Sequence, residues 1–371
     1  MNFKKTAALT FTAAATAVAA KYGPDYLNTR LLCNVKKLDD NIGLCDYRLP
    51  YDLDYFLEKG VSNTGEVLSH IAGKSLVGRA LKFGKGDFAC SSFDAVSEDG
   101  DHIYARNFDY KTGPCMVVWT HPENGYESIG IADSNFMLYG NNRNILKDKN
   151  RFQSVLAPYC CMDGINEKGL TIGILELKTK ATKQETGKKP ITTTVAIRGV
   201  LDKCATVAEA VEFFKSYDMH DALFCCYHYQ IADANGDSVV IEYVNNEMRL
   251  FYPEKKSDDV FPSQYITNFF LSEDGDNFKG FGYDRYTRMQ TVLGKKNGKM
   301  SEDEAMELLE KVHLHYKHDV YPWYVITLWS AVYNCNKGTL KLCAGLDYSK
   351  AYSFDIHKPA EAVSAEECEV K

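Results

Sequence analysis

The sequence predicts an α+β fold in which helices and antiparallel strands occur in separate blocks. Segments with strand character follow one another from residue 90 onward, whereas helical periodicity is confined to a few stretches, without strict β-α alternation. The chain also contains 24 tyrosines and 19 phenylalanines, a composition that suits aromatic-rich sheets. These observations favour layers in which one sheet packs on another.

The first part of the chain, residues 21–89, is expected to be mainly helical. The segments "YDLDYFLEKG" and "TGEVLSHIAGKSLVGRALKFG" space their apolar residues as amphipathic helices do, and two glycines end the second segment. Residues 1–20 have a basic start, a run of small and apolar residues and an Ala-x-Ala ending, which is the shape of a signal peptide. We therefore expect a signal peptide or N-terminal anchor there, and we favour an exported or membrane-anchored protein over a cytoplasmic one.

Strands begin at Cys90. The β-prone runs "CSSFDAV" and "HIYARNF" flank the turn-forming segment "SEDGD", which predicts a hairpin. Further strands are expected at "MVVWTH" and "GLTIGILEL", whereas Lys178–Pro190 has no apolar period and predicts an exposed loop.

Two helices are predicted in the second half of the chain. One begins at Thr206, in "TVAEAVEFFKSY", and the other at Ser301, where Ser301 and Glu304 form a capping box. Between them, residues 227–252 and 264–270 indicate a β-meander, and residues 323–356 indicate strands around the turn "NCNKG".

Composition excludes several functions. The formal net charge is -7, with 25% charged residues and no basic stripe, so the chain is not expected to bind nucleic acid. None of the twelve cysteines forms a C-x-x-C spacing, so neither a metal nor another cofactor is expected.

The predicted hairpin places Cys90 near Arg106 and Asp109. These residues alone leave two interpretations open. Cys90 can be a small buried hydrophobe beside a surface ion pair. Alternatively, a thiol, a guanidinium and a carboxylate share one end of the sheet as a reactive site.

Five segments in order carry a resemblance to a known family. They are "CSSF", "DGDHIYARNFDY", "DGINEKGL", "TNFF" and "YDRYTR". This pattern resembles the N-terminal-nucleophile cysteine hydrolases of linear amides, which include bile salt hydrolases, penicillin V acylases, N-acylethanolamine acid amidases and acid ceramidases. The resemblance implies an αββα four-layer sandwich over residues 90–371, preceded by a propeptide or small subunit at 21–89. It also implies that the protein cuts its own Ala89-Cys90 bond.

The same resemblance implies roles for three hairpin residues. Cys90 would be the nucleophile, and its freed α-amino group would serve as the base that removes the thiol proton. Asp109 would hold and orient that amino group. Arg106 would favour the thiolate and position the substrate carbonyl.

Three further residues are carried over by position. Asn268 in "YITNFF" would donate into the oxyanion hole, and Arg285 in "YDRYTR" matches the second arginine of the family. Glu176 stands where bile salt hydrolases and penicillin acylases have an asparagine. A glutamate there, and a long segment before the nucleophile, are similar to the N-acylethanolamine amidase branch, so we expect Glu176 to tune the site.

The resulting expectation is a self-processing amidase that hydrolyses the C-N bond of an N-acyl compound, most plausibly a fatty-acyl amide, through a Cys90 thioester. Bile salt or penicillin V hydrolysis and acyl transfer are alternatives with the same chemistry. An unprocessed binding protein and a redox protein using Cys115 are alternatives from other classes. The expected partner is a small-molecule N-acyl amide, with weak membrane-surface contact for a lipid substrate and an apolar cleft that includes Phe269, Phe270 and Phe281. The sequence predicts no oligomeric state.

Overall fold

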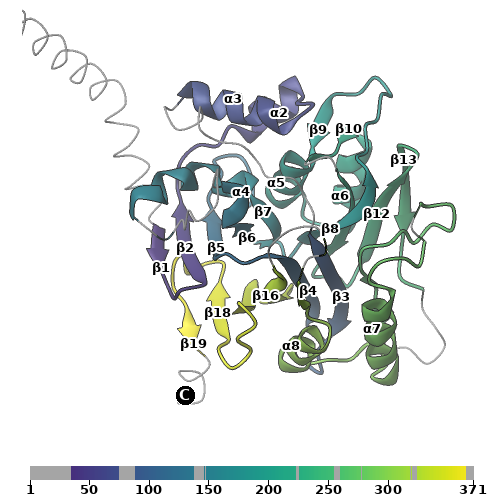
Figure 1. Cartoon of the computed structure of the whole chain (residues 1–371). Coiled ribbons are helices and arrows are strands. Elements are labelled where there is room, and N and C mark those ends of the chain that lie inside the picture. Colours follow the sequence, from purple (N-terminus) through teal and green to yellow (C-terminus); the bar gives the residue numbers. More distant parts are fainter. Residues whose placement is uncertain are drawn as a thin grey trace, which may run out of the picture.

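The computed structural model describes residues 35–74, 88–137, 146, 148–222, 225–254, 260–276, 278–317, 319 and 324–364. Over these ranges the chain forms two large sheets that pack face to face, with helices on the outer faces (Figure 1). This arrangement confirms the predicted α+β class and the αββα sandwich.

One sheet has nine strands within the described residues. Their order is β1 (Val35–Lys37), β2 (Ile42–Tyr47), β5 (Cys115–Thr120), β6 (Ser128–Asp133), β7 (Cys161–Asn166), β8 (Thr171–Lys180), β11 (Cys225–Ala232), β12 (Ser238–Val244) and β13 (Glu247–Phe251). Neighbouring strands are antiparallel except for β2 and β5, which run parallel. The strands at the centre are buried on both faces, because one face meets the other sheet and the other meets helices.

The second sheet carries the predicted hairpin. Its strands are β14 (Tyr265–Ile266), β3 (Ala89–Val96), β4 (His102–Lys111), β16 (Tyr324–Asn334), β17 (Thr339–Ala344), β18 (Tyr352–Asp355) and β19 (Val363–Ser364), with β15 (His315–Lys317) paired to β16. A small parallel pair, β9 (Pro190–Thr192) and β10 (Asp218–His220), lies apart from both sheets. The register of β3 and β4 sets Ala89 opposite Asp109 and Cys90 opposite Phe108, so the hairpin prediction is confirmed.

Helices lie on the outer sides of the two sheets. They are α2 (Leu53–Lys59), α3 (Thr64–Lys74), α4 (Ser134–Met137), the 3-10 helix η2 (Asp148–Tyr159), α5 (Thr193–Lys203), α6 (Val207–Lys215), α7 (Tyr283–Lys295) and α8 (Glu302–Lys311). Helices α5 and α6 contact the nine-stranded sheet, and α7 and α8 contact the other sheet, whereas α2 packs on helix α5 and not on a sheet. The predicted caps are confirmed, because the Thr206 side chain accepts the N–H of Glu209 and the Ser301–Glu304 capping box is complete. None of the described helices is both long and apolar enough to span a membrane.

The N-terminal region contains helices, as predicted, and also two strands that the sequence analysis did not predict. Helices α2 and α3 lie in residues 35–74, but β1 and β2 join the nine-stranded sheet. Strand β2 pairs with β5 along its whole length, from Ile42 opposite Cys115 to Tyr47 opposite Thr120. This region is therefore built into the sandwich. The expected signal peptide at 1–20 lies outside the described residues.

Candidate active site

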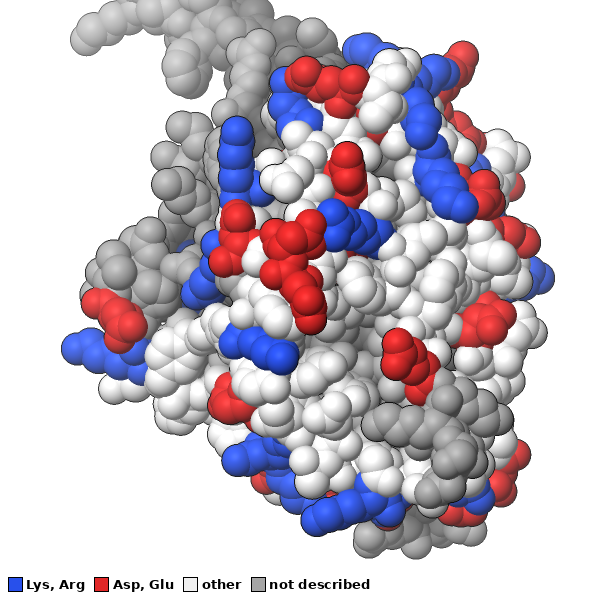
Figure 2. All heavy atoms as spheres, turned by 90° about the vertical axis from the view of Figure 1, so that its right-hand side faces the viewer, with Lys and Arg blue, Asp and Glu red and all other residues white. Residues whose placement is uncertain are grey.

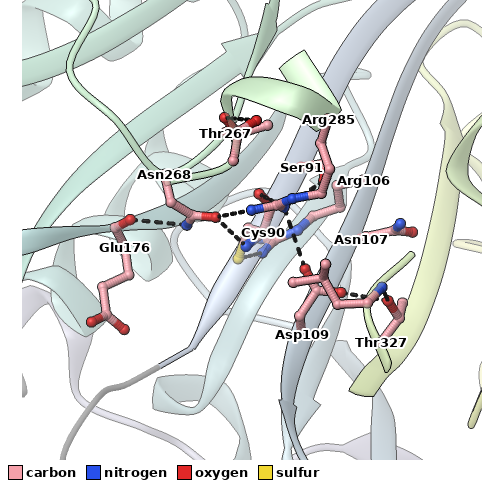
Figure 3. Close-up of polar contacts among 12 residues, drawn as sticks. Cys90, Ser91, Arg106, Asn107, Asp109, Glu176, Thr267, Asn268, Arg285 and Thr327 are labelled. Carbon is pink, nitrogen blue, oxygen red and sulfur yellow. Dashed lines mark hydrogen bonds and ion pairs between the residues drawn. The ribbon is translucent and has the colours of Figure 1, made fainter. Parts of the chain in front are cut away.

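The hairpin brings the thiol of Cys90 into contact with the guanidinium of Arg106. Arg106 Nη2 donates to the Cys90 sulfur at 3.0 Å, and both residues are fully buried (Figure 3). The contact follows from the strand register, because Ser92 lies opposite Arg106 and Cys90 lies one pleat away on the same face of β3.

The guanidinium of Arg106 is fixed by two backbone carbonyls. Nη1 donates to the carbonyl of Met162 at 2.7 Å, and Nη2 donates to that of Ile174 at 2.9 Å. Gly173 makes this approach possible, since a Cβ there would lie 2.9 Å from Arg106 Nη1 and 2.3 Å from the Tyr104 hydroxyl. The nine-stranded sheet thus holds an arginine that belongs to the opposite sheet.

Asn268 and Arg285 hold the backbone around Cys90. Asn268 Oδ1 accepts the N–H of Cys90 at 2.9 Å and a proton of Arg285 Nη2 at 2.8 Å, while its Nδ2 donates to the carbonyl of Glu176 at 2.9 Å. Arg285 Nη1 donates to the carbonyl of Cys90 at 2.6 Å and to Ser91 Oγ at 2.8 Å. Asn268 Oδ1 is therefore the hydrogen-bond acceptor of the nitrogen that cleavage before Cys90 would turn into an α-amino group. The Nδ2 group of Asn268 faces the backbone carbonyl of Glu176.

Asp109 lies at the same end of the sheet, opposite Ala89 in the strand register. Its Oδ1 accepts the Thr327 hydroxyl, and its Oδ2 lies 3.6 Å from Arg285 Nη1. Burial raises the pKa of Asp109 to about 6, although the positive charge of Arg285 opposes this rise. The carboxyl group is therefore mostly ionised at neutral pH and titrates under mildly acidic conditions.

Glu176 faces the residues before Cys90 and not the sulfur. Its Oε2 accepts the N–H of Phe88 at 2.7 Å, and the Cys225 sulfur lies 3.4 Å from its Oε1. Figure 3 shows its carboxylate pointing away from Cys90. The structure thus brings all six predicted site residues together, and Glu176 lies beside Phe88, two positions before Cys90.

The side chain of Phe88 fills an aromatic box beside Cys90. It is 1% exposed. The walls of the box are Phe108, Tyr110, Phe136 and Tyr227, whose ring centroids lie 5.1 to 6.2 Å from that of Phe88. Phe88 therefore occupies the apolar space next to Cys90.

The expected cleft phenylalanines are placed differently. Phe269 and Phe270 are each 3% exposed. Phe269 packs against the rings of Tyr283 and Tyr286, whereas Phe270 borders a surface pocket beside the ends of β8 and β12. Phe281 is 36% exposed, and its ring lies 5.4 Å from the guanidinium carbon of Arg285. Figure 2 shows the face with α7 and β13, where uncharged side chains cover much of the surface between scattered charges of both signs. Phe281 therefore lies between the molecular surface and Arg285.

The thiol of Cys90 is a weak acid in the uncut chain. Burial raises its pKa to about 12, and the positive charge of Arg106 opposes this effect only in part. The thiol is thus protonated at neutral pH and needs a base to react. Cleavage before Cys90 would create such a base on the same residue.

Sequence reasoning missed two residues that support the site. Asp163, in the "DGIN" part of one quoted segment, lies 3.2 Å from Arg106 Nη1 and is fully buried. Thr327, on β16, donates to Asp109. A carboxylate within the otherwise apolar run "CMDGIN" is a signal for Asp163, whereas nothing in the sequence around Thr327 singles it out.

Comparisons with known proteins identify a matching family and similar solved structures. The family model of acyl-coenzyme A:6-aminopenicillanic acid acyl-transferase matches residues 96–347, a range that includes five of the six predicted catalytic residues and excludes Cys90 and the preceding Ala89. A conjugated bile acid hydrolase mutant from Clostridium perfringens aligns with a TM-score of 0.52 and 16% identity, covering 74% of this chain and 96% of its own.

Two further solved structures are similar. Penicillin V acylase from Agrobacterium tumefaciens aligns with a TM-score of 0.53 and 18% identity, over 72% of this chain and 87% of its own. An N-acylethanolamine-hydrolyzing acid amidase ortholog from Caenorhabditis elegans aligns with a TM-score of 0.41 and 17% identity, over 66% of this chain and 93% of its own. The bile acid hydrolase and the penicillin acylase show the same fold as this chain.

Proposed function

Because the chain belongs to the acyl-coenzyme A:6-aminopenicillanic acid acyl-transferase family, we propose that it is a self-processing cysteine amidase of N-acyl compounds. One observation carries this proposal. The nitrogen and the sulfur of Cys90 each have a buried partner of their own, Asn268 Oδ1 at 2.9 Å and Arg106 Nη2 at 3.0 Å. A residue that is to act as nucleophile and base together needs both groups held in this way.

In the processing step, the Cys90 sulfur attacks the carbonyl carbon of Ala89. A carbon-sulfur bond forms, the Ala89-Cys90 carbon-nitrogen bond breaks, and the thiol proton ends on the released nitrogen. Water then hydrolyses the thioester, which leaves a carboxylate on Ala89 and a free thiol and α-amino group on Cys90. Arg285 holds the Cys90 carbonyl at 2.6 Å and fixes the strand while this bond is cut.

In turnover, the α-amino group of Cys90, with an ordinary pKa of about 8, takes the thiol proton. The thiolate attacks the carbonyl carbon of the substrate amide, the amide C-N bond breaks, and the ammonium group gives its proton to the leaving amine. Water, deprotonated by the same amino group, then hydrolyses the Cys90 thioester, which releases the carboxylic acid and restores the thiol. The Arg106 guanidinium and the amide of Asn268 stabilise negative charge on sulfur and oxygen. Asp109, ionised above a pKa of about 6, favours the ammonium form that protonates the leaving group.

The aromatic box supports an apolar acyl group as the substrate class. Phe88 and Ala89 are the acyl part of the bond that the protein cuts in itself, so the side chain of Phe88 marks the acyl side of the site. That side is walled by four aromatic rings, a setting that suits a hydrocarbon chain. We therefore propose fatty-acyl amides ahead of conjugated bile salts and phenoxyacetyl amides.

Acyl transfer is a second candidate. The matching family is described as an acyl-transferase, and a Cys90 thioester can pass its acyl group to an amine as well as to water. Product analysis with and without an added amine separates the two reactions.

Intact-mass spectrometry and N-terminal sequencing of the purified protein, beside its Cys90→Ala variant, test the proposal. We expect a fragment that begins Cys-Ser-Ser-Phe in the wild type and a single full-length chain of 41.8 kDa in the variant. The cut protein is then assayed on fatty-acyl amides, bile salts and phenoxyacetyl amides. An uncut wild type that hydrolyses none of them contradicts the proposal and supports the binding-protein alternative.

A further inference from the structure

A buried carboxylate, that of Asp163, lies behind the arginine that contacts the nucleophile. Asp163 is on β7 and is fully buried between the sheets, with its Oδ2 atom 3.2 Å from Arg106 Nη1. The reaction steps proposed above give it no role. A buried carboxylate is unfavourable unless donors compensate its charge, so its partners indicate what it does.

The partners of Asp163 all come from the opposite sheet. Trp329 Nε1 donates to Oδ2 at 3.0 Å, and the hydroxyl of Tyr333 donates to Oδ1. Both donors are on β16, and Arg106 is on the neighbouring strand β4. The carboxylate is thus held in one position by three side chains that are themselves fully buried.

The guanidinium of Arg106 lies between two groups that compete for its charge. Nη1 faces Asp163 at 3.2 Å, and Nη2 donates to the Cys90 sulfur at 3.0 Å. The carbonyls of Met162 and Ile174 fix the plane of the guanidinium. Arg106 therefore cannot rotate to shorten its distance to Asp163 or to the Cys90 sulfur. One buried positive charge is therefore shared between a carboxylate and a sulfur.

We propose that Asp163 is a positioning residue that holds the Arg106 guanidinium against the Cys90 sulfur and sets how much of its positive charge the sulfur receives. This inference rests on the proposed amidase reaction, in which Cys90 becomes a thiolate. The other charged groups that act on the sulfur are Asp109 on β4, Glu176 on β8 and Arg285 on α7, and in the cut protein the α-amino group of Cys90 acts on it as well.

Two isosteric variants give opposite expectations. Asp163→Asn removes the competing negative charge and keeps an oxygen acceptor for Trp329 or Tyr333. The sulfur then receives more of the Arg106 charge, and the pKa of the thiol falls. Tyr333→Phe removes a donor that disperses the charge of Asp163, so the carboxylate draws more strongly on Arg106 and the pKa of the thiol rises.

The test is the pH dependence of Cys90 alkylation by iodoacetamide in the cut protein, followed by mass spectrometry of the peptide that begins at Cys90. We expect the midpoint to fall by about one pH unit in Asp163→Asn and to rise by less than that in Tyr333→Phe. Asp133→Asn is the matched control, because Asp133 is also fully buried in this sheet but bonds to Asn135. Its midpoint is expected to equal that of the wild type.

An unchanged midpoint in Asp163→Asn, or an equal shift in Asp133→Asn, overturns the role of Asp163 while leaving the amidase proposal intact. If Asp163→Asn does not fold, the alkylation midpoint of Tyr333→Phe becomes the test. A midpoint in Tyr333→Phe equal to that of the wild type overturns the inference. A wild type that yields no fragment beginning at Cys90 contradicts the amidase proposal itself, and the role of Asp163 falls with it.

Discussion

The side-chain oxygen of Asn268 lies 2.9 Å from the backbone nitrogen of Cys90, although the two residues are 178 positions apart in the chain. The same oxygen also accepts from Arg285, so one amide group joins the nucleophile to the second arginine. In the intact chain this oxygen accepts the peptide N–H of Cys90. Under the proposed function, the same oxygen would accept from the amine that cleavage creates.

Asn268→Ala is expected to slow both the self-cut and turnover by about 10²- to 10³-fold, because the nitrogen of Cys90 loses its acceptor and the oxyanion loses a donor. Asn268→Asp keeps the acceptor and is expected to lose less of the self-cutting rate. The rates are read from band intensities on denaturing gels over time. A wild-type rate in Asn268→Ala would remove Asn268 from the site.

Glu176→Asn is expected to slow the self-cut more than turnover. The carboxylate of Glu176 accepts the N–H of Phe88 at 2.7 Å, and the shorter asparagine does not reach it. The measurement compares the half-time of processing with kcat of protein that is already fully cut. If neither value changes, Glu176 has no part in the site.

A buried pair positions the loop that carries Asn268. Glu242 lies 2.7 Å from His228 Nε2, and its two oxygens accept the N–H groups of Leu271 and Ser272 at 3.0 Å each. Glu242→Gln loses one acceptor, so the loop is expected to shift and kcat to fall at least tenfold, with KM changed little. Steady-state kinetics on the cut protein measure this split.

The control for Glu242 is Asp221→Asn, which alters a half-buried carboxylate that accepts hydrogen bonds from Thr182, Thr193 and Tyr229. It is expected to lower stability without the same fall in kcat. Equal falls in kcat would show that both variants act through general destabilisation.

The buried carboxylate of Asp109 is expected to lower the stability of the fold at neutral pH while being required for activity. Burial raises its folded-state pKa to about 6 from an ordinary value of 3.8, so the folded protein binds a proton more tightly than the unfolded chain. The stability that this group contributes is present below pH 3.8 and is lost as the pH rises through about 6. Asp109→Asn removes the buried charge and is expected to be inactive, yet more stable at pH 7 by on the order of 1–3 kcal/mol.

Thermal unfolding at pH 7 and pH 4 checks this expectation in a Cys90→Ala background, where every sample stays uncut. The Tm difference between the chains with and without Asp109→Asn is expected to shrink at pH 4, because the wild-type carboxyl is then largely protonated in the folded state. A lower Tm for Asp109→Asn at pH 7 would contradict it.

The N-terminal fragment is expected to stay attached after the cut. Strand β2 lies inside the nine-stranded sheet, and the hydroxyl of Tyr51 donates to Asp202 on α5 at 2.6 Å. In size-exclusion chromatography of cut protein, both fragments are expected to elute in one peak. They are expected to separate only in denaturant. Tyr51→Phe removes one hydrogen bond and is expected to lower the free energy of unfolding by about 1 kcal/mol, which lowers the denaturant midpoint slightly. Release of the fragment under native conditions would count against this assignment.

Sequence reasoning located the hairpin and the two capped helices, because each has a local signal. Turn residues between β-prone runs fixed the register that sets Ala89 against Asp109. The position of Asn268 came only from the family pattern, since no local rule joins it to Cys90.

The elements that were missed lack such signals. Helix α5 is buried on nearly every side, so its apolar residues form no single stripe. Strand β2, with the sequence "IGLCDY", is short and gains its stability from a partner strand that lies far along the chain. Tertiary contacts decide both elements, and a single sequence does not display them.

The parallel pairing of β2 with β5 also limits how the protein can be produced. A chain started at Cys90 would lack β2 and would expose the backbone edge of β5, whose residues Cys115–Thr120 are all buried in the full chain. Such an apolar edge is a template for pairing with other copies and for aggregation. Residues 90–371 are therefore best obtained by synthesis of the whole chain, because β2 then pairs with β5 and covers its backbone edge.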